Sequence, residues 1–265
     1  MDTVETIYLN IAGFNIQINF KSIEWEFAYR IKKNEINKYW KGFIISRPKK
    51  TDYTINFVGE NHIKTINKIK ERTQYILFYK KNSNKILTVN YLISIFHFQI
   101  LLRQVINDLL SQHNGFILHA SSNLVNNYAT IFLAPSGGGK STIMKLLSKK
   151  YQPLADDTVF IRKEFNKYYL YQTPFIEKES WIIKNNNKYL LNKIYLLNKS
   201  SKYLITKIVD NETKIDKIFQ QFWTDKNSYS KQTRTIIRLI LNNNFYNIFF
   251  GVNSDKLITL LNKYD

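Results

Sequence analysis

The sequence predicts an α/β fold, with a phosphate-binding core in the C-terminal part of the chain and a small, mostly β region before it. A glycine-rich stretch at residues 134–142 lies between an apolar run at 128–133 and a segment with helical spacing, which is the strand–loop–helix order of phosphate-binding loops. Earlier in the chain the short apolar runs have strand character, whereas apolar side chains recur every three or four positions over 91–113. We therefore expect a β-rich region at 1–90 and a nucleotide-binding domain at 91–265.

The composition indicates how many domains the chain can form and excludes several kinds of site. The chain has 265 residues, of which 44% are hydrophobic, which is enough for one large domain or two modest ones. It contains no cysteine, which excludes disulfides, thiolate metal sites and a cysteine nucleophile. The chain opens without a basic leader, and no apolar run approaches the ~20 residues of a membrane span. We expect a soluble cytoplasmic protein with no membrane partner.

The formal net charge of +19 raises the question of nucleic-acid binding. The lysines, however, are spread along the whole chain among asparagines and isoleucines, as residues 184–193 illustrate, and no basic cluster stands out. Because Lys, Asn and Ile share A/T-rich codons, a biased genome produces this composition without selection for a polyanionic partner. We therefore do not expect a nucleic-acid partner, although a basic surface still steers anionic substrates.

The first 90 residues have the pattern of a β region. Apolar and polar residues alternate from Phe14 onward, and Gly13 separates two short runs, as in two strands joined by a turn. A polar turn at 81–84 predicts a hairpin. The region carries no chemical motif, so its expected role is structural, or that of a lid or substrate platform. Further strands are expected at 42–46, 53–58, 74–79 and 86–89.

Helical and strand patterns alternate in the rest of the chain. The helix at 91–113 is expected to end at Asn114 and Gly115, where glycine permits a left-handed stop. A strand follows at 115–122, and another opens at Pro153. Further strands are expected at 168–172, 193–197, 203–209 and 245–250, and further helices at 141–149, 215–223 and 256–261.

The glycine-rich stretch predicts a nucleotide-binding site. Glycines let successive backbone N–H groups turn inward and surround phosphate oxygens, and a helix N-terminus near Lys140 adds unpaired N–H groups at the same place. In such a loop Lys140 reaches the terminal phosphates and the hydroxyl of Ser141 ligates Mg²⁺. Ala134, the smallest replacement, stands where the first glycine is usual. The residues expected to bind the nucleotide are Ser136, Gly137, Gly138, Gly139, Lys140, Ser141 and Thr142.

A pair of carboxylates follows the loop at a suggestive distance. Asp156 and Asp157 lie 16 and 17 residues beyond Lys140, at the start of a strand that can lie beside the phosphate-loop strand. Two neighbouring carboxylates near one metal ion suit divided roles, one holding Mg²⁺ and the other accepting a proton. The alternative is a solvated acidic turn. His119, on the strand before the phosphate-loop strand, is a further candidate because of that position.

Three motifs together resemble the HPr kinase/phosphorylase family: LHASS at 118–122, FLAPSGGGKST at 132–142 and LADD at 154–157. The likeness is greater to the smaller HPr-kinase-related proteins, including those found beside lasso-peptide and other modified-peptide biosynthesis genes. It covers roughly residues 90–200, and the three motifs in order are far more specific than any one of them. The resemblance implies a fold like that of ATP-dependent phosphoenolpyruvate carboxykinase, with the phosphate loop in a mixed sheet.

The same resemblance implies roles for individual residues. Asp156 would be the base toward a serine hydroxyl, Asp157 would support Mg²⁺ with Ser141, and His119 would lie near the phosphates and the aspartate. ATP and Mg²⁺ are the implied cofactors. The resemblance does not extend to the glycine-rich segment with Glu and Arg that bifunctional HPr kinases carry downstream. It therefore implies neither phosphorylase activity nor HPr as the substrate.

The predicted function is an ATP-dependent kinase that phosphorylates a serine of a peptide, a protein or a small molecule, with Asp156, His119 and Lys140 as the catalytic residues. The alternative is a non-catalytic nucleotide-binding module, or an NTPase that acts as a switch or sensor. The combination of Lys140, Ser141 and the aspartate pair favours the enzyme, because a nucleotide binder needs no base. The sequence leaves open the acceptor and whether the chain forms a homo-oligomer.

Overall fold

The chain folds into two compact units, Met1–Gln104 and Val105–Asp265, here called the N-terminal unit and the C-terminal unit. The division falls inside helix α2 (Ile95–Gln112), whereas the sequence pattern placed it just before that helix. Within the described part of the chain, no helix is long and apolar enough to cross a membrane. The computed structural model describes residues 3–21, 26–59, 66–68, 73–75 and 78–264.

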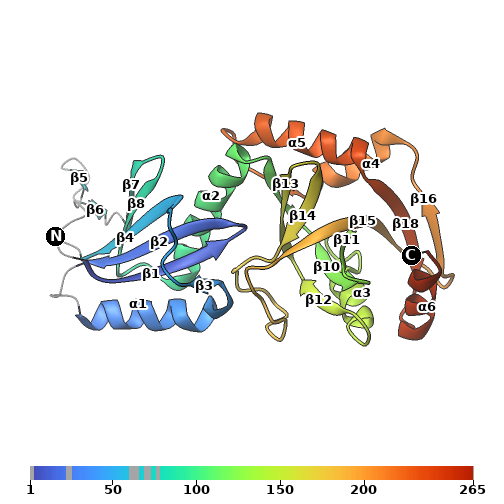
Figure 1. Cartoon of the computed structure of the whole chain (residues 1–265), viewed down its shortest axis with the longest axis horizontal. Coiled ribbons are helices and arrows are strands. Elements are labelled where there is room, and N and C mark those ends of the chain that lie inside the picture. Colours follow the sequence, from blue (N-terminus) through green and yellow to red (C-terminus); the bar gives the residue numbers. More distant parts are fainter. Residues whose placement is uncertain (1–2, 22–25, 60–65, 69–72, 76–77, 265) are drawn as a thin grey trace. The chain divides into compact units, whose positions relative to one another are not determined.

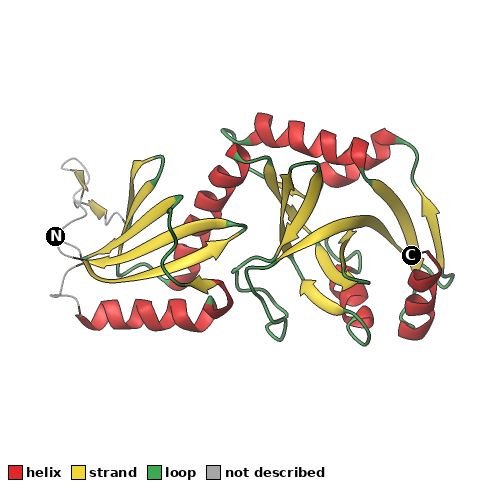
Figure 2. Cartoon of the chain, viewed as in Figure 1, coloured by secondary structure: helices red, strands yellow, loops and turns green. Residues whose placement is uncertain are grey.

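The N-terminal unit contains a six-stranded mixed sheet in the order β3-β1-β2-β4-β8-β7 (Figures 1 and 2). Strands β1 and β2 form an antiparallel hairpin whose turn, Ala12 and Gly13, has positive φ angles of 52° and 78°. β4 is parallel to both β2 and β8, while β7 and β8 form the expected antiparallel hairpin. The elements are β1 (Thr3–Ile11), β2 (Phe14–Lys21), α1 (Glu26–Tyr39), η2 (Lys41–Phe43), β3 (Ile44–Ile45), β4 (Tyr53–Val58), β5 (Ile66–Lys68), β6 (Thr73–Tyr75), β7 (Tyr79–Ser83) and β8 (Ile86–Asn90).

Aromatic side chains fill the core of the N-terminal unit. Phe57 stacks on Phe20 with ring centroids 5.6 Å apart and meets Phe98 of α2 edge-on at 4.9 Å. Trp40 packs against the same Phe98 at 5.4 Å, so the first turns of α2 belong to this unit. No helix was expected over α1, whose only two residues classed as buried are Lys32 and Ile36. The strand expected at 74–79 corresponds to the ends of β6 and β7, and residues 76 and 77 lie outside the described part of the chain.

The C-terminal unit is built on a second, larger mixed sheet. Its path runs β12-β10-β11-β15-β14-β13-β9-β17, and β18 pairs with β15 and with β16. The long strand β15 is parallel to β11 and β18 but antiparallel to β14, which makes the sheet mixed. The strands are β9 (Gly115–His119), β10 (Ser121–Val125), β11 (Tyr128–Leu133), β12 (Gln152–Ala155), β13 (Thr158–Glu164), β14 (Lys167–Tyr171), β15 (Lys188–Lys199), β16 (Leu204–Lys207), β17 (Phe222–Trp223) and β18 (Asn244–Phe250).

Successive side chains along the strands point to opposite faces of the sheet, so the core of this unit has two layers. Ile131 and Leu133 of β11 belong to the apolar cluster that includes residues of helices α4 and α5, whereas the intervening Phe132 belongs to the cluster of α3 and α6. Figure 1 shows α4 and α5 on one side of the sheet and α3 and α6 on the other. The glycine-rich loop follows the C-terminal end of β11, which lies between β10 and β15. The loop therefore lies at the ends of the strands of a sheet that is covered on both faces. The helices are α3 (Lys140–Leu147), α4 (Asn211–Phe219), α5 (Tyr229–Asn242) and α6 (Ser254–Tyr264).

The main difference from the expected elements in this unit is α5. Its buried face consists of Gln232, Thr235, Ile236, Leu239 and Ile240, which are spaced as one side of a helix. The apolar side chains of this segment recur with helical spacing, but the helix was not among the elements expected from the sequence. The helix expected at 215–223 begins earlier, as α4, and its last two residues form the short strand β17, which pairs with β9.

Candidate phosphate-binding site

The loop between β11 and α3 has the backbone conformation that its glycines predict. Gly137 has a φ of 74° and Gly139, the residue that caps α3, has a φ of 100°. These left-handed conformations strain any residue with a Cβ atom. The carbonyl of Gly139 accepts the first helical hydrogen bond, from Ile143 at 2.9 Å. The loop thus turns into a helix N-terminus at Lys140, the arrangement that binds phosphate.

The side chain of Ala134 fits in this loop because Gly138, which lies against it, has no Cβ atom. A Cβ atom built on Gly138 would lie only 2.5 Å from the Cβ of Ala134 and 3.0 Å from the carbonyl of Pro135. The N–H of Gly138 donates to that same carbonyl at 3.0 Å, which closes the turn. Alanine is therefore accommodated at position 134 because the residue facing it has no side chain.

Lys140 lies buried under the loop, with 7% of its surface exposed. Its ammonium donates to the carbonyl oxygens of Ala134 at 2.7 Å and Pro135 at 3.3 Å. Burial lowers the pKa of Lys140, against the opposing field of Asp157 and Asp156, which lie close enough to favour its charged form. Ser121 of β10 donates its hydroxyl to the carbonyl of Lys140 at 2.8 Å and so fixes the start of α3 to the sheet.

The aspartate pair forms the two-residue connection between β12 and β13. Asp156 is buried, and its Oδ1 atom has no hydrogen-bond partner among the described residues. Asp157 is half exposed, and its Oδ1 lies 3.0 Å from Nδ1 of His119. Its Oδ2 accepts the hydroxyl of Thr158, also at 3.0 Å. The pairing of β9 with β13 places His119 opposite Thr158 and hence beside the pair.

The residues present fit a magnesium ion by their donor chemistry. Mg²⁺ takes oxygen ligands and is usually held by one or two carboxylates together with substrate phosphates. The buried, unpartnered oxygen of Asp156 is such a donor, and half-buried Ser141 supplies a hydroxyl on the first turn of α3. Thr142, its neighbour, is exposed. Within the described residues no group of three or more His, Cys, Asp or Glu side chains forms a protein-only metal cage.

Sequence reasoning missed a support for the aspartate pair. Glu177, whose side chain is 3% exposed, accepts the backbone N–H groups of Asp156 and Thr158, both at 3.3 Å. It also accepts the hydroxyl of Thr173 at 3.1 Å and pairs with Lys184 at 3.1 Å. One carboxylate therefore holds the backbone on both sides of Asp157. In a chain this rich in lysine, nothing in the sequence marks Glu177 or Lys184.

The loop that carries Glu177 is itself tied to the core. Gln172 donates to the carbonyl of Leu154 in β12 at 2.8 Å and accepts the N–H of Asn185 at 3.1 Å, so the loop begins and ends beside the aspartate turn. Glu179 pairs with Lys145 of α3 at 2.8 Å. Burial lowers the pKa of Lys184, while Glu177 opposes that change.

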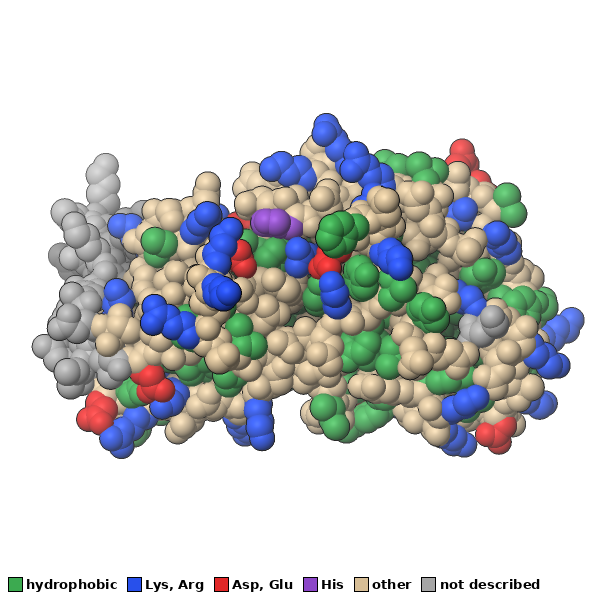
Figure 3. Space-filling model, viewed as in Figure 1, with side chains coloured by type: hydrophobic (Ala, Val, Ile, Leu, Met, Phe, Trp, Pro, Cys, Tyr) green, Lys and Arg blue, Asp and Glu red, His purple; other side chains and the backbone are tan. Residues whose placement is uncertain are grey.

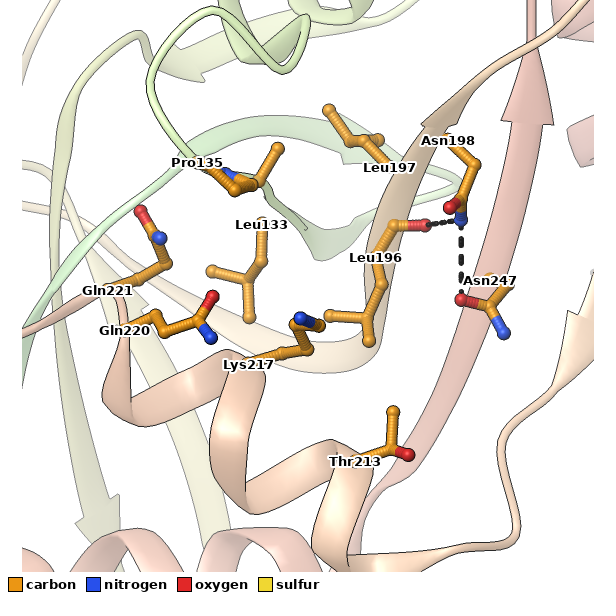
Figure 4. A pocket seen from close by; sticks show the side chains of 11 residues that line it. Leu133, Pro135, Leu196, Leu197, Asn198, Thr213, Lys217, Gln220, Gln221 and Asn247 are labelled. Carbon is orange, nitrogen blue, oxygen red and sulfur yellow. Dashed lines mark hydrogen bonds between the residues drawn. The ribbon is translucent and has the colours of Figure 1, made fainter.

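A pocket of about 220 Å³ adjoins the start of the phosphate loop (Figure 4). The side chains of Lys217, in α4, and Gln220, which directly follows α4, reach into it toward Leu133 and Leu196 of the sheet. Asn198 donates to the carbonyl of Leu196 at 3.2 Å and to the amide oxygen of Asn247 at 3.3 Å. The lining residues are Leu133, Ala134, Pro135, Leu196, Leu197, Asn198, Thr213, Lys217, Gln220, Gln221 and Asn247.

The basic side chains are dispersed over the surface. On the face shown in Figure 3, lysines and arginines are scattered among polar and apolar side chains and do not form one continuous patch. This agrees with their even spread along the sequence. The charge therefore gives no outline of a nucleic-acid interface on that face.

Comparisons with known proteins leave the family open. No family model matches the chain, and no curated protein matches it. Among solved structures, the Hpr(Ser) kinase/phosphatase from Coxiella burnetii is similar over 56% of this chain and 95% of that chain, with 14% sequence identity and a TM-score of 0.35. A TM-score this low carries no argument, so the interpretation of the site rests on its own geometry.

Proposed function

We propose that the chain is an ATP-dependent kinase that transfers the γ-phosphoryl group to a serine hydroxyl of a peptide, a protein or a small molecule. The glycine-rich loop and the N-terminus of α3 would bind the phosphates, with residues 136–142 in contact. Lys140 would exchange its two backbone carbonyl partners for phosphate oxygens. Mg²⁺, held by Ser141 and an aspartate, would neutralise charge on the phosphates.

The aspartate pair would supply the proton acceptor. As the serine oxygen forms its bond to the γ-phosphorus, the bond from that phosphorus to the bridging oxygen breaks and ADP leaves. The hydroxyl proton passes to the carboxylate of Asp156, whose Oδ1 has no hydrogen-bond partner among the described residues. His119 would hold Asp157 in place through their 3.0 Å contact.

The observation that carries this proposal is the free oxygen of Asp156. A buried carboxylate oxygen without a partner costs free energy unless a proton or a cation meets it. Beside the glycine-rich loop, such an atom is suited to accept the proton of an attacking hydroxyl or to bind Mg²⁺. The Mg²⁺ titration below separates these two roles.

The test is a pair of isosteric variants measured across a Mg²⁺ titration. Asp156→Asn keeps the shape of the base but removes its charge, so we expect ATP affinity to stay near wild type while transfer falls on the order of a hundred- to ten-thousand-fold. Asp157→Asn should instead raise the Mg²⁺ concentration required for half-maximal transfer. Chelator should abolish activity, and Mg²⁺ or Mn²⁺ should restore it.

Three outcomes separate the alternatives. If the two variants exchange phenotypes, the roles of the carboxylates are reversed and the kinase proposal stands. If both variants hydrolyse ATP and transfer phosphate as the wild type does, the pair is only a turn and the proposal fails. If the wild type hydrolyses ATP but phosphorylates no candidate acceptor, the NTPase switch is the better description.

A further inference from the structure

The pocket of Figure 4 has the position expected of an acceptor site, an inference that rests on the proposed kinase function. Its wall includes Ala134 and Pro135, the two residues whose carbonyls hold the ammonium of Lys140. In a phosphate loop that ammonium marks the place of the terminal phosphates. The pocket therefore adjoins the end of the nucleotide from which a phosphoryl group is transferred.

Another lining residue of the pocket, Gln221, is connected to the aspartate pair through His119. Gln221 lines the pocket, and its backbone carbonyl accepts the N–H of His119 at 2.8 Å. Nδ1 of His119 lies 3.0 Å from Asp157, and the N–H of Ala120 donates to the carbonyl of Asp157 at 2.9 Å. The pocket is thus joined through direct contacts to the lysine that would meet the phosphates and, through His119, to Asp157, the neighbour of the proposed base Asp156.

The lining of the pocket selects a class of ligand. Four amide side chains face it, from Asn198, Gln220, Gln221 and Asn247, and no carboxylate does. Amides donate and accept hydrogen bonds, so they recognise neutral polar groups. Asp216 accepts the amide N–H group of Gln220 at 2.8 and 2.9 Å and lies 3.1 Å from the ammonium of Lys217, so a ligand carboxylate would take the place of Asp216 at that ammonium. With a volume of about 220 Å³ the pocket is smaller than those that hold drug-sized ligands, which indicates a compact molecule or a single side chain.

We propose that this pocket binds the phosphate acceptor, and that the acceptor is a serine unit: a hydroxymethyl group next to amide or carboxylate groups. The amides that follow α4 and those of strands β15 and β18 hold the neighbouring groups and leave the hydroxyl directed to the glycine-rich loop. Free serine and a serine residue in a peptide share this chemistry. They differ at the carboxylate, which is charged in free serine and replaced by a neutral amide in a peptide.

The test uses three probes as acceptors with γ-labelled ATP: L-serine, N-acetyl-L-serine amide and glycerol. Glycerol has hydroxyls but neither amide nor carboxylate. It should therefore be phosphorylated far more slowly than the better of the two serine probes. Gln220→Leu removes one amide and should raise the KM of that probe about tenfold with the KM of ATP unchanged. Lys217→Met should raise the KM of L-serine only. An effect of Lys217→Met confined to L-serine identifies free serine as the source, whereas preference for the capped probe identifies a peptide.

Lys214→Met is the matched control, because Lys214 lies on the same helix, faces the ring of Phe245 and does not line the pocket. It should leave both KM values at wild type. The acceptor assignment is overturned if Gln220→Leu raises the KM of ATP and not that of the acceptor, which would make this a nucleobase pocket. It is equally overturned if the wild type transfers phosphate to glycerol as well as to either serine probe. ATP binding, measured separately by calorimetry, distinguishes these failures from failure of the kinase proposal itself, in which no ATP binds.

Discussion

Two lysines of the C-terminal unit, Lys140, which is buried, and Lys184, which is partly buried, have opposite kinds of partner. Lys184 is paired with the carboxylate of Glu177 at 3.1 Å and also donates to the carbonyl of Phe175 at 2.8 Å. Lys140 donates to two backbone carbonyls, and among the described residues no carboxylate forms a salt bridge with it. Burial lowers the pKa of both. The difference lies in whether the positive charge is already compensated.

That difference separates a structural cation from a ligand-binding one. A buried ion pair is costly to break, because removing either partner leaves an uncompensated charge. Neutral carbonyls compensate an ammonium only partly, so phosphate oxygens can replace them with a net gain in electrostatic free energy. We infer that Lys184 holds the aspartate turn in place through Glu177, whereas Lys140 is available to the nucleotide.

The largest expected effect comes from Lys140→Met. The variant loses the buried cation under the loop, so phosphoryl transfer should fall by about a thousandfold or more and ATP affinity should fall with it. Its free energy of unfolding should fall less than that of Lys184→Met, because Lys140 forms no salt bridge among the described residues and interacts with Asp156 and Asp157 only through their field. Transfer assays and urea denaturation measure the two quantities. Lys140→Arg should also transfer poorly, since a planar guanidinium does not replace a compact ammonium.

The same substitution at the other lysine should have the opposite profile. Lys184→Met leaves Glu177 buried without its cation, so the free energy of unfolding should fall by about 3 kcal/mol. The ATP affinity of the folded fraction should remain near wild type. Adding Glu177→Gln to Lys184→Met should recover much of the lost stability, because the double variant has no uncompensated charge. Equal losses of stability for Lys140→Met and Lys184→Met would show that the comparison between the two lysines is wrong.

The sequence marks Lys140 as a candidate but does not mark Lys184, and the reason is physical. The proposed role of Lys140 depends on a contiguous stretch, since the glycines, the lysine and the helix start would act through local backbone geometry. Asp156 and His119 were also identified as candidates, and the structure places His119 beside the pair because β9 lies against β13. Lys184 acquires its role only when a loop folds back onto the aspartate turn, which is a tertiary event.

The secondary structure was likewise predictable only in part. Strands β4 and β11 and helices α3 and α6 have strong periods, and each appears at or near its expected place. Helix α1 was not assigned, because its buried face includes Lys32 and its helical state depends on packing, which a single-sequence pattern does not contain. Helix α5 was missed although its apolar side chains recur with helical spacing. The mixed pairing of β15 is likewise a property of the whole sheet.

The smallest expected effect is a pH dependence of ATP binding that belongs to Lys140 alone. Burial lowers the pKa of Lys140 from its ordinary value of 10.5 in the free protein, and bound phosphates would raise it because they favour the charged form. Between these two pKa values binding therefore takes up a proton. ATP affinity should be independent of this group below the lowered pKa and should weaken as pH rises through it, by at most tenfold per pH unit.

The measurement is the ratio of wild-type to Lys140→Met affinity for ATP, taken by calorimetry from neutral pH up to about pH 10, near the usual lysine pKa. The ratio cancels the titration of ATP itself and of Lys184, which both proteins retain. It should decline before the ordinary lysine pKa is reached, because only the wild type must keep a buried ammonium charged. Circular dichroism at each pH verifies that both proteins are folded. A ratio that stays constant over this range would mean that Lys140 does not meet the phosphates. The contrast between a ligand-binding Lys140 and a structural Lys184 would then be wrong.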